Sequence, residues 1–212
     1  MIPAKAALER LRAGNLRFAH GVRTAEPTDA EQRRRELAYG QQPFAIVLGC
    51  SDSRVPAEIV FDQGLGDLFV IRVAGNIVAP SQIGSIEFAA ERFGTRLVVV
   101  LGHSQCGAVQ ATLEELGRAG DGPSRHLRSI VERIRPAVEP LLESSAQHDA
   151  STLLRLAIRA NVRKSTDQLR HGSEVLERLL AKDLWVVGGE YDLESGVVEF
   201  FDGLPLQSAA TR

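Results

Sequence analysis

Three short runs of apolar residues most constrain how this chain can fold. They cover residues 44–48, 68–71 and 97–101, and each is rich in Val, Ile, Leu or Phe without alternating polar residues. Runs of this length and composition are typical of strands buried on both faces. Stretches with helical spacing, residues 56–61 and 83–93, separate them. The order strand, helix, strand, helix, strand predicts an α/β fold with a central, mostly parallel sheet flanked by helices.

The remainder of the chain is also predicted to consist of helices and short strands. Residues 6–18 have the apolar spacing of a helix, and Thr28 with Glu31 forms a capping pair for a second helix that ends near Gly40. Further on we expect a helix over 107–118, helical segments to about residue 180, a strand at 184–187 and a final pair of strands around Gly196.

No internal boundary divides these elements, so we expect one domain over residues 1–212. Residues 1–40 would form a helical N-terminal arm, and 41–212 the α/β core and C-terminal segment. With 25 basic and 27 acidic residues the net charge is −2, which argues against a nucleic-acid partner or an anionic membrane surface. Neither a leader pattern nor a long apolar run is present, so we expect a cytoplasmic protein with a small-molecule substrate.

The two cysteines lie where predicted strands end. Cys50 follows the first strand, and His103 and Cys106 follow the third. Because parallel strands end at one edge of a sheet, these three side chains can converge. Two thiolates and an imidazole suit zinc, and three protein ligands leave a fourth position open, as in catalytic sites. Inert buried thiols or a single disulfide remain alternatives, whereas a thiol redox protein is disfavoured because the spacing is not Cys-x-x-Cys.

Other residues near these strand ends could support a metal centre. Cys106 should lie at a helix N-terminus, where backbone amides favour a thiolate, and Gly102 and Gly107 would let the backbone approach a metal closely. Asp52 and Arg54 can pair so that the guanidinium orients the carboxylate beside the open position. An ordinary ion pair at the start of a loop is the alternative.

Three motifs together resemble the ordered signature of the β-class carbonic anhydrases. They are Cys50–Arg54, Val73–Asn76 and Gly102–Gly107. The resemblance implies one Zn²⁺ per subunit, held by Cys50, His103 and Cys106. It also implies reversible hydration of carbon dioxide to bicarbonate and a proton by attack of zinc-bound hydroxide. In that family Asp52 would accept a hydrogen bond from the hydroxide, and Arg54 would hold Asp52.

The resemblance further implies a substrate pocket and an oligomer. Gln41, Phe69, Phe88 and Gly107 align with substrate-binding positions of the plant-like branch, which often has Tyr where this chain has Phe88. The family implies a homodimer or a dimer of dimers, with the N-terminal arm wrapped around the neighbour. An amphipathic helix ahead of the first strand has no obvious groove to fill in its own chain, which is compatible with that arrangement.

One branch of this family is inhibited when bicarbonate binds a separate pocket and Asp52 moves onto zinc. That pocket needs a Trp, where this chain has Val47, together with Arg72 and Tyr191. Val cannot donate a hydrogen bond, so we expect the branch that lacks this switch, with Asp52 paired to Arg54. Arg72 and Tyr191 would then bond each other or nearby backbone. Rival functions are a zinc hydrolase of carbonyl sulfide or carbon disulfide and a non-catalytic zinc-binding protein.

Overall fold

A five-stranded sheet forms the centre of the molecule. The computed structural model describes residues 2–22, 24, 30–117, 124–142 and 148–205. The strand order is β2-β1-β3-β4-β5, with four parallel strands and an antiparallel β5 at one edge. The strands are β1 (Ala45–Gly49), β2 (Leu68–Arg72), β3 (Leu97–His103), β4 (Trp185–Tyr191) and β5 (Val198–Asp202).

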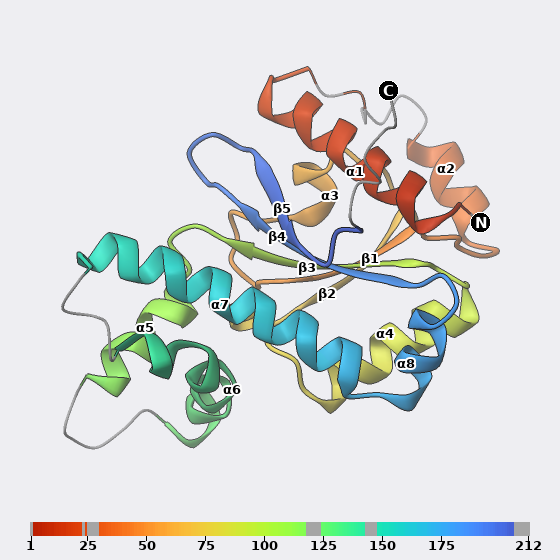
Figure 1. Ribbon diagram of the computed structural model, residues 1–212. Coiled ribbons are helices and arrows are strands. Elements are labelled where there is room, and N and C mark those ends of the chain that lie inside the picture. The colour runs from red at the N-terminus through yellow and green to blue at the C-terminus, as the bar shows by residue number, and fades with distance from the viewer. Residues whose placement is uncertain (1, 23, 25–29, 118–123, 143–147, 206–212) are drawn as a thin grey trace, which may run out of the picture.

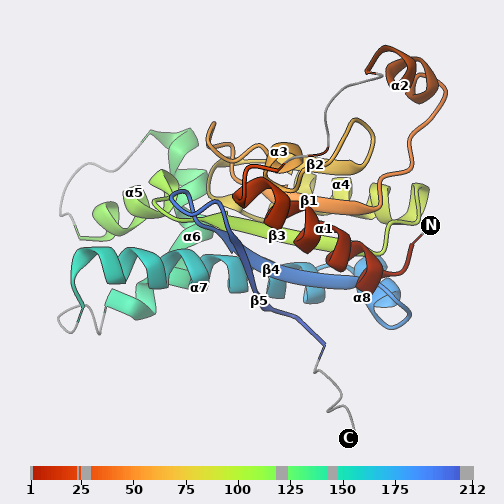
Figure 2. The same ribbon diagram turned by 90° about the horizontal axis from the view of Figure 1, so that it is seen from above.

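Helices cover both faces of this sheet (Figures 1 and 2). α1 and α3 lie on one face, α4, α7 and α8 lie on the other, and α5 and α6 pack together beyond the carboxyl end of β3. The helices are α1 (Ala4–Ala19), α2 (Ala30–Leu37), α3 (Ala57–Val60), α4 (Pro80–Arg92), α5 (Gly107–Leu116), α6 (Arg125–Leu142), α7 (Ala150–His171) and α8 (Glu174–Leu180), with a 3₁₀ turn, η1, at Ala74–Asn76. The predicted α/β fold with a mostly parallel sheet is confirmed.

The two central strands are buried along their whole length, as the apolar runs predict. In β1, Val47 packs into the core beneath α1 and α3, whereas Ile46 and Leu48 pack beneath α4 and α7. The same alternation runs through β3, whose residues are all buried. Both faces of each strand therefore contribute to a core, which is why neither strand needs a polar face.

The N-terminal helix α1 packs on its own chain, so the expectation that it lacks an intrachain groove is wrong. Ala7 and Leu11 are fully buried in the core between α1 and the sheet. Asn15, itself 2% exposed, donates from Nδ2 to the Val60 and Gly196 carbonyls and accepts from the Val198 amide. These bonds join α1 to α3 and to the β4–β5 turn.

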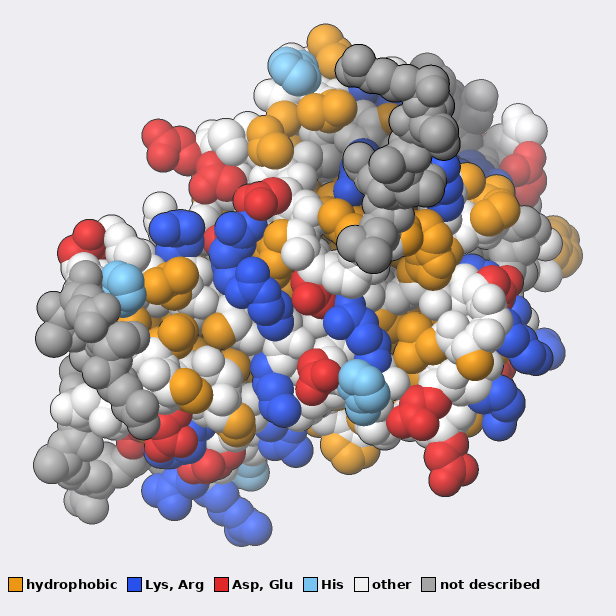
Figure 3. All heavy atoms as spheres, viewed as in Figure 1, with side chains coloured by type: hydrophobic (Ala, Val, Ile, Leu, Met, Phe, Trp, Pro, Cys, Tyr) orange, Lys and Arg blue, Asp and Glu red, His pale blue; other side chains and the backbone are white. Residues whose placement is uncertain are grey.

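The second predicted helix is present as α2, at the periphery of the molecule (Figure 2). The proposed capping residue Thr28 lies outside the described residues. Within the described part of the chain, no helix is both long and apolar enough to cross a membrane. On the face drawn in Figure 3, basic and acidic side chains are interspersed, in keeping with the nearly balanced charge.

Candidate metal centre

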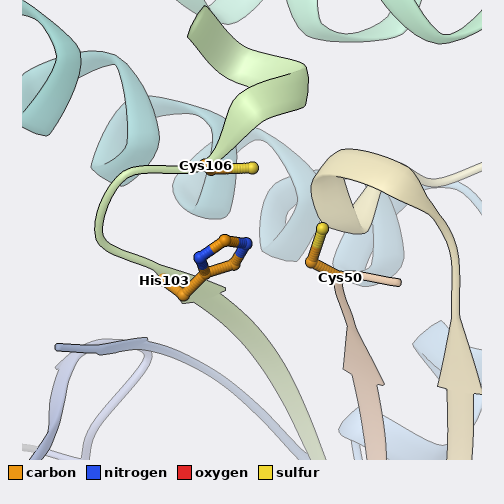
Figure 4. Close-up of side chains that lie close together, drawn as sticks. All are labelled: Cys50, His103 and Cys106. Atoms are coloured by element: carbon orange, nitrogen blue, oxygen red, sulfur yellow. The ribbon is translucent and has the colours of Figure 1, made fainter. Parts of the chain in front are cut away.

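Cys50, His103 and Cys106 meet at the carboxyl end of the sheet (Figure 4). Cys50 follows β1, His103 ends β3, and Cys106 is the residue just before α5. Their ligand atoms all lie within 4.8 Å of one another, and the side chains point toward a common centre. All three residues are buried, at 4%, 0% and 1% exposure. The convergence predicted from the ends of parallel strands is confirmed.

The His103 ring is oriented as a metal-binding imidazole would be. Its Nδ1 lies 2.9 Å from the Ser104 carbonyl oxygen, a contact that requires a proton on Nδ1. The lone pair of Nε2 is then free to bind a cation. Nε2 is buried and has no hydrogen-bond partner among the residues that the structure describes. A buried nitrogen left unsatisfied beside two sulfurs fits a metal ligand.

Cys50 and Cys106 change each other's acidity through a shared hydrogen bond. A hydrogen bond from Cys106 lowers the pKa of Cys50 from 9.0 to about 4, and the nearby His103 ring and the Gly75 amide act in the same direction against the effect of burial. The hydrogen bond to Cys50, together with burial, raises the pKa of Cys106, although the amides of Val109 and Ala108 at the start of α5 oppose this. One thiolate therefore forms readily, and a cation would favour the second.

Asp52 lies beside this group and is held by Arg54. Arg54 donates from Nε to Asp52 Oδ1 at 2.9 Å and from Nη2 to Oδ2 at 2.8 Å. This bidentate pair, with the Arg54 amide bond to Oδ1, holds the pKa of Asp52 well below its usual range. Asp52 Oδ2 is 3.9 Å from His103 Nε2, so the carboxylate faces the metal-binding group.

Arg72 fixes the loop that carries Cys50 and Asp52. It donates to the Cys50 carbonyl at 3.0 Å and to the Asp52 carbonyl at 2.6 Å. Arg72 thus bonds nearby backbone, one of the two arrangements expected for it. Its role in supporting this loop is not evident from sequence, because only pairing of β2 with β1 brings Arg72 opposite Gly49.

This chain is similar to known proteins over most of its length. The profile described as carbonic anhydrase matches residues 45–198. The carbonic anhydrase of Mycolicibacterium smegmatis is 40% identical over 202 residues, which cover 92% of this chain and 91% of that protein. Carbonic anhydrase 2 of Mycobacterium tuberculosis is 39% identical over 199 residues, covering 90% and 89%. This chain belongs to the carbonic anhydrase family.

The structural comparison assigns the class within that family. The β-carbonic anhydrase CafA of Aspergillus fumigatus superimposes with a TM-score of 0.75 at 27% identity, covering 95% of this chain and 91% of that one. The chain is therefore a β-class carbonic anhydrase, an enzyme of reversible carbon dioxide hydration with zinc as cofactor. Its Cys50, His103 and Cys106 form a group of soft and borderline donors that suits this ion.

Three of the four residues expected to bind substrate lie away from this metal group. Gln41 precedes β1, at the end opposite Cys50. Phe69 pairs with Ile46, four residues and about 13 Å along the strand from Cys50. Phe88 is 54% exposed and packs against Phe69, with ring centroids 6.3 Å apart. Phe69 and Phe88 thus pack together on the α4 side of the sheet.

The two glycines expected near the metal have different environments. Gly107 begins α5 directly after Cys106, and a Cβ there would meet no atom within 4 Å. At Gly102 a Cβ would lie 2.5 Å from Val162 Cγ2, so this glycine gives room to α7. Gly102 therefore has a packing role against α7, and its approach to the metal stays a prediction.

The motif Val73–Asn76 contains a contact that the sequence alone did not reveal. The Gly75 amide donates to Cys50 Sγ at 3.3 Å, from a turn in which Gly75 has φ +70° and Asn76 has φ +43°. A Gly-Asn pair shortly after a strand is a sequence signal for such a turn. Its target could not be read from the sequence, because Cys50 lies on a different strand end.

Proposed function

We propose that Cys50, His103 and Cys106 bind one zinc ion per subunit and that carbon dioxide is hydrated beside them, with Asp52 and Arg54 as catalytic residues. The observation that carries this proposal is the convergence of three buried ligand atoms next to the Asp52 carboxylate, 3.9 Å from His103 Nε2. Zinc, when bound, supplies a water acidified enough to act as a nucleophile near neutral pH.

Asp52 and Arg54 together orient the nucleophile. Asp52 stays ionised because Arg54 bonds both of its oxygens, so it accepts a hydrogen bond from an O–H group and cannot donate one. The Arg54 side chain, which is 49% exposed, fixes the direction of that acceptor. An O–H group held in this way presents its lone pair toward the incoming carbon atom.

A second copy of the chain completes the substrate pocket. Gln41, Phe69 and Phe88 lie too far from their own metal group to touch a molecule bound there, yet Phe88 is half exposed. A homodimer, or a dimer of such dimers, would bring these side chains to the metal group of the neighbouring subunit. Phe69 and Phe88 would then form an apolar wall for carbon dioxide, Gln41 would supply a donor, and Gly107 would lie at the pocket beside Cys106.

In the resting enzyme, Asp52 is paired with Arg54 and does not ligate the metal. Two observations support this form. Arg72 is engaged by the carbonyls of Cys50 and Asp52, and Val47 is fully buried in the core beneath α1. Bicarbonate would therefore act as a product and not as a switch, which is the branch of the family without that regulation.

A cytoplasmic location fits the same chemistry. Both cysteines are free thiols at the metal group, and a reducing compartment preserves thiols in that state. Two alternatives use the same ligands: hydrolysis of carbonyl sulfide or carbon disulfide, and zinc binding without turnover. Zinc content together with assays of hydration and hydrolysis distinguishes them from carbonic anhydrase activity.

Zinc content and carbon dioxide hydration, measured together, test the proposal. We expect about one zinc per subunit and rapid hydration in stopped flow for the wild type, and loss of both in Cys50→Ser. Hydration assayed beside carbonyl sulfide hydrolysis identifies the preferred substrate. If the zinc-loaded protein does not hydrate carbon dioxide, only a zinc-binding function remains. Purified protein without zinc would refute the ligand assignment.

A further inference from the structure

The turn that follows β2 has an unusual backbone. Gly75 and Asn76, the last two residues of η1, both have positive φ, at +70° and +43°. Gly adopts this region without steric cost, and Asn adopts it more readily than most residues. Side chains from another part of the chain bond the carbonyls of both residues.

The turn has one consequence for the metal centre. Its Gly75 amide donates to Cys50 Sγ at 3.3 Å. An N–H···S bond stabilises negative charge on sulfur and adjusts how strongly that sulfur donates to a metal. The turn fits closely between helices, because a Cβ on Gly75 would lie 2.7 Å from Ile134 Cδ1 and 3.2 Å from Ala108 Cβ. Little space is therefore left around the residue whose amide bonds the sulfur.

Two buried side chains of α7 hold the turn in place. Asn161 donates from Nδ2 to the Gly75 carbonyl at 2.8 Å, and Ser165 donates from Oγ to the Asn76 carbonyl at 3.1 Å. Asn161 and Ser165 are 1% and 2% exposed and lie one helical turn apart, on the same face of α7. Both carbonyls of the left-handed pair are therefore bonded from one rigid element.

We propose that Asn161, assisted by Ser165, is a positioning residue of the metal centre, holding the turn so that the Gly75 amide stays on Cys50 Sγ. Asn161 and Ser165 bond the carbonyl oxygens of the turn and not the sulfur, so their effect on the metal passes through Gly75. The inference rests on the proposed role of Cys50 as a zinc ligand. It adds a support from α7, an element that carries none of the three ligands.

A purely structural role for Asn161 is the competing explanation. Loss of any buried hydrogen bond weakens a fold, so stability alone cannot separate the two roles. Thr166 offers a matched control on the same helix. It is fully buried and donates to Asp202 Oδ2 of β5 at 2.7 Å, on a side of α7 that does not meet the turn.

Three variants, Asn161→Leu, Ser165→Ala and Thr166→Val, would be purified as zinc-loaded enzymes. Zinc affinity is measured by competition with a chromophoric chelator, and the sulfur-to-metal charge-transfer absorption after exchange of zinc for Co²⁺. We expect Asn161→Leu to weaken zinc binding by about tenfold to a hundredfold and to shift the absorption band. Ser165→Ala should act in the same direction but less, and Thr166→Val should match the wild type in both measurements.

The proposal is overturned if Asn161→Leu and Thr166→Val bind zinc equally and show the same band. If Asn161→Leu does not fold, Ser165→Ala decides, and a wild-type band and affinity in that variant overturn the proposal as well. Failure of the proposed zinc ligands gives a different result, because the wild type would then neither retain zinc nor show a sulfur-to-cobalt band.

Discussion

At the scale of single residues, two arginines hold different parts of the segment around Asp52. Arg54 bonds the Asp52 side chain, and Arg72 bonds the Asp52 and Cys50 carbonyls. The side chain of Asp52 is 18% exposed, so solvent screens the ion pair only in part. The ion pair matters because it orients the Asp52 carboxylate. Two hydrogen bonds fix the plane of the carboxylate, whereas a single bond would let it rotate.

Replacing Arg54 should reduce turnover without removing zinc. We expect Arg54→Ala to lower turnover in stopped-flow hydration about tenfold to a hundredfold while the zinc content stays at one per subunit. The pKa of Asp52 should rise toward 3.8 when its main cause of depression is lost, which still leaves the carboxylate ionised above pH 6. The defect should therefore be the same at every pH from about 6 to 9.

Arg54→Lys is the matched control, because it keeps the charge and loses the two-point geometry. Activity close to the wild type in Arg54→Lys would mean that charge alone suffices. A defect in Arg54→Ala that disappears at alkaline pH would contradict orientation of the nucleophile, since it would point to a protonation effect.

At the scale of elements, close backbone packing attaches α1 to the sheet domain. A Cβ on Gly14 would lie 1.9 Å from the Phe61 carbonyl oxygen at the end of α3. This contact exists because Gly14 has no side chain, and it brings Asn15 within reach of the Val60 carbonyl. α1 therefore belongs to the core of its own chain, whatever else it contacts in an oligomer.

Gly14→Ala tests this packing, because helix propensity and the backbone clash predict changes in stability of opposite sign. Helix propensity alone favours Ala by about 1 kcal/mol, whereas the backbone clash should destabilise the protein by about 1–3 kcal/mol. We expect a lower urea midpoint for Gly14→Ala. The neighbouring exposed Ala13 supplies the comparison, since Ala13→Gly should cost only about 0.5–1 kcal/mol by propensity. A higher midpoint for Gly14→Ala would mean that α1 does not pack here in solution.

At the scale of the whole molecule, the distance between the metal group and the aromatic surface predicts shared active sites. Hybrid dimers with two affinity tags can test this. In the first hybrid, one subunit carries Cys50→Ser and the other carries Gln41→Ala. If Gln41 contributes to the active site of the neighbouring subunit, one of the two active sites in this hybrid is intact. We then expect about half of the wild-type activity.

The second hybrid is the reciprocal control. It combines a wild-type subunit with one that carries both Cys50→Ser and Gln41→Ala, so a shared pocket leaves both of its sites impaired. Stopped-flow hydration by the two purified hybrids gives the comparison. Half activity in the second hybrid and little in the first would show that Gln41 acts within its own chain.

Much of the fold and the metal group could be predicted from sequence because each rests on local patterns. Residues 44–48 and 97–101 are apolar enough to require cover on both faces, which implies a parallel sheet with helices on each side. Parallel strands end at one edge, so Cys50 and His103 had to come near each other. A His three residues before a Cys, at the start of a helix, then completed the group.

The tertiary structure alone decided features that depend on pairing between distant elements. The sequence contains Gly75, Asn161 and Arg72, but their partners follow from how α7 crosses the sheet and how β2 pairs with β1. The close approach of α1 to α3 includes a backbone contact at Gly14 that no apolar pattern encodes. Hydrophobic periodicity reports which face of an element is buried, whereas side-chain hydrogen bonds and close backbone contacts depend on three-dimensional positions set by the whole fold.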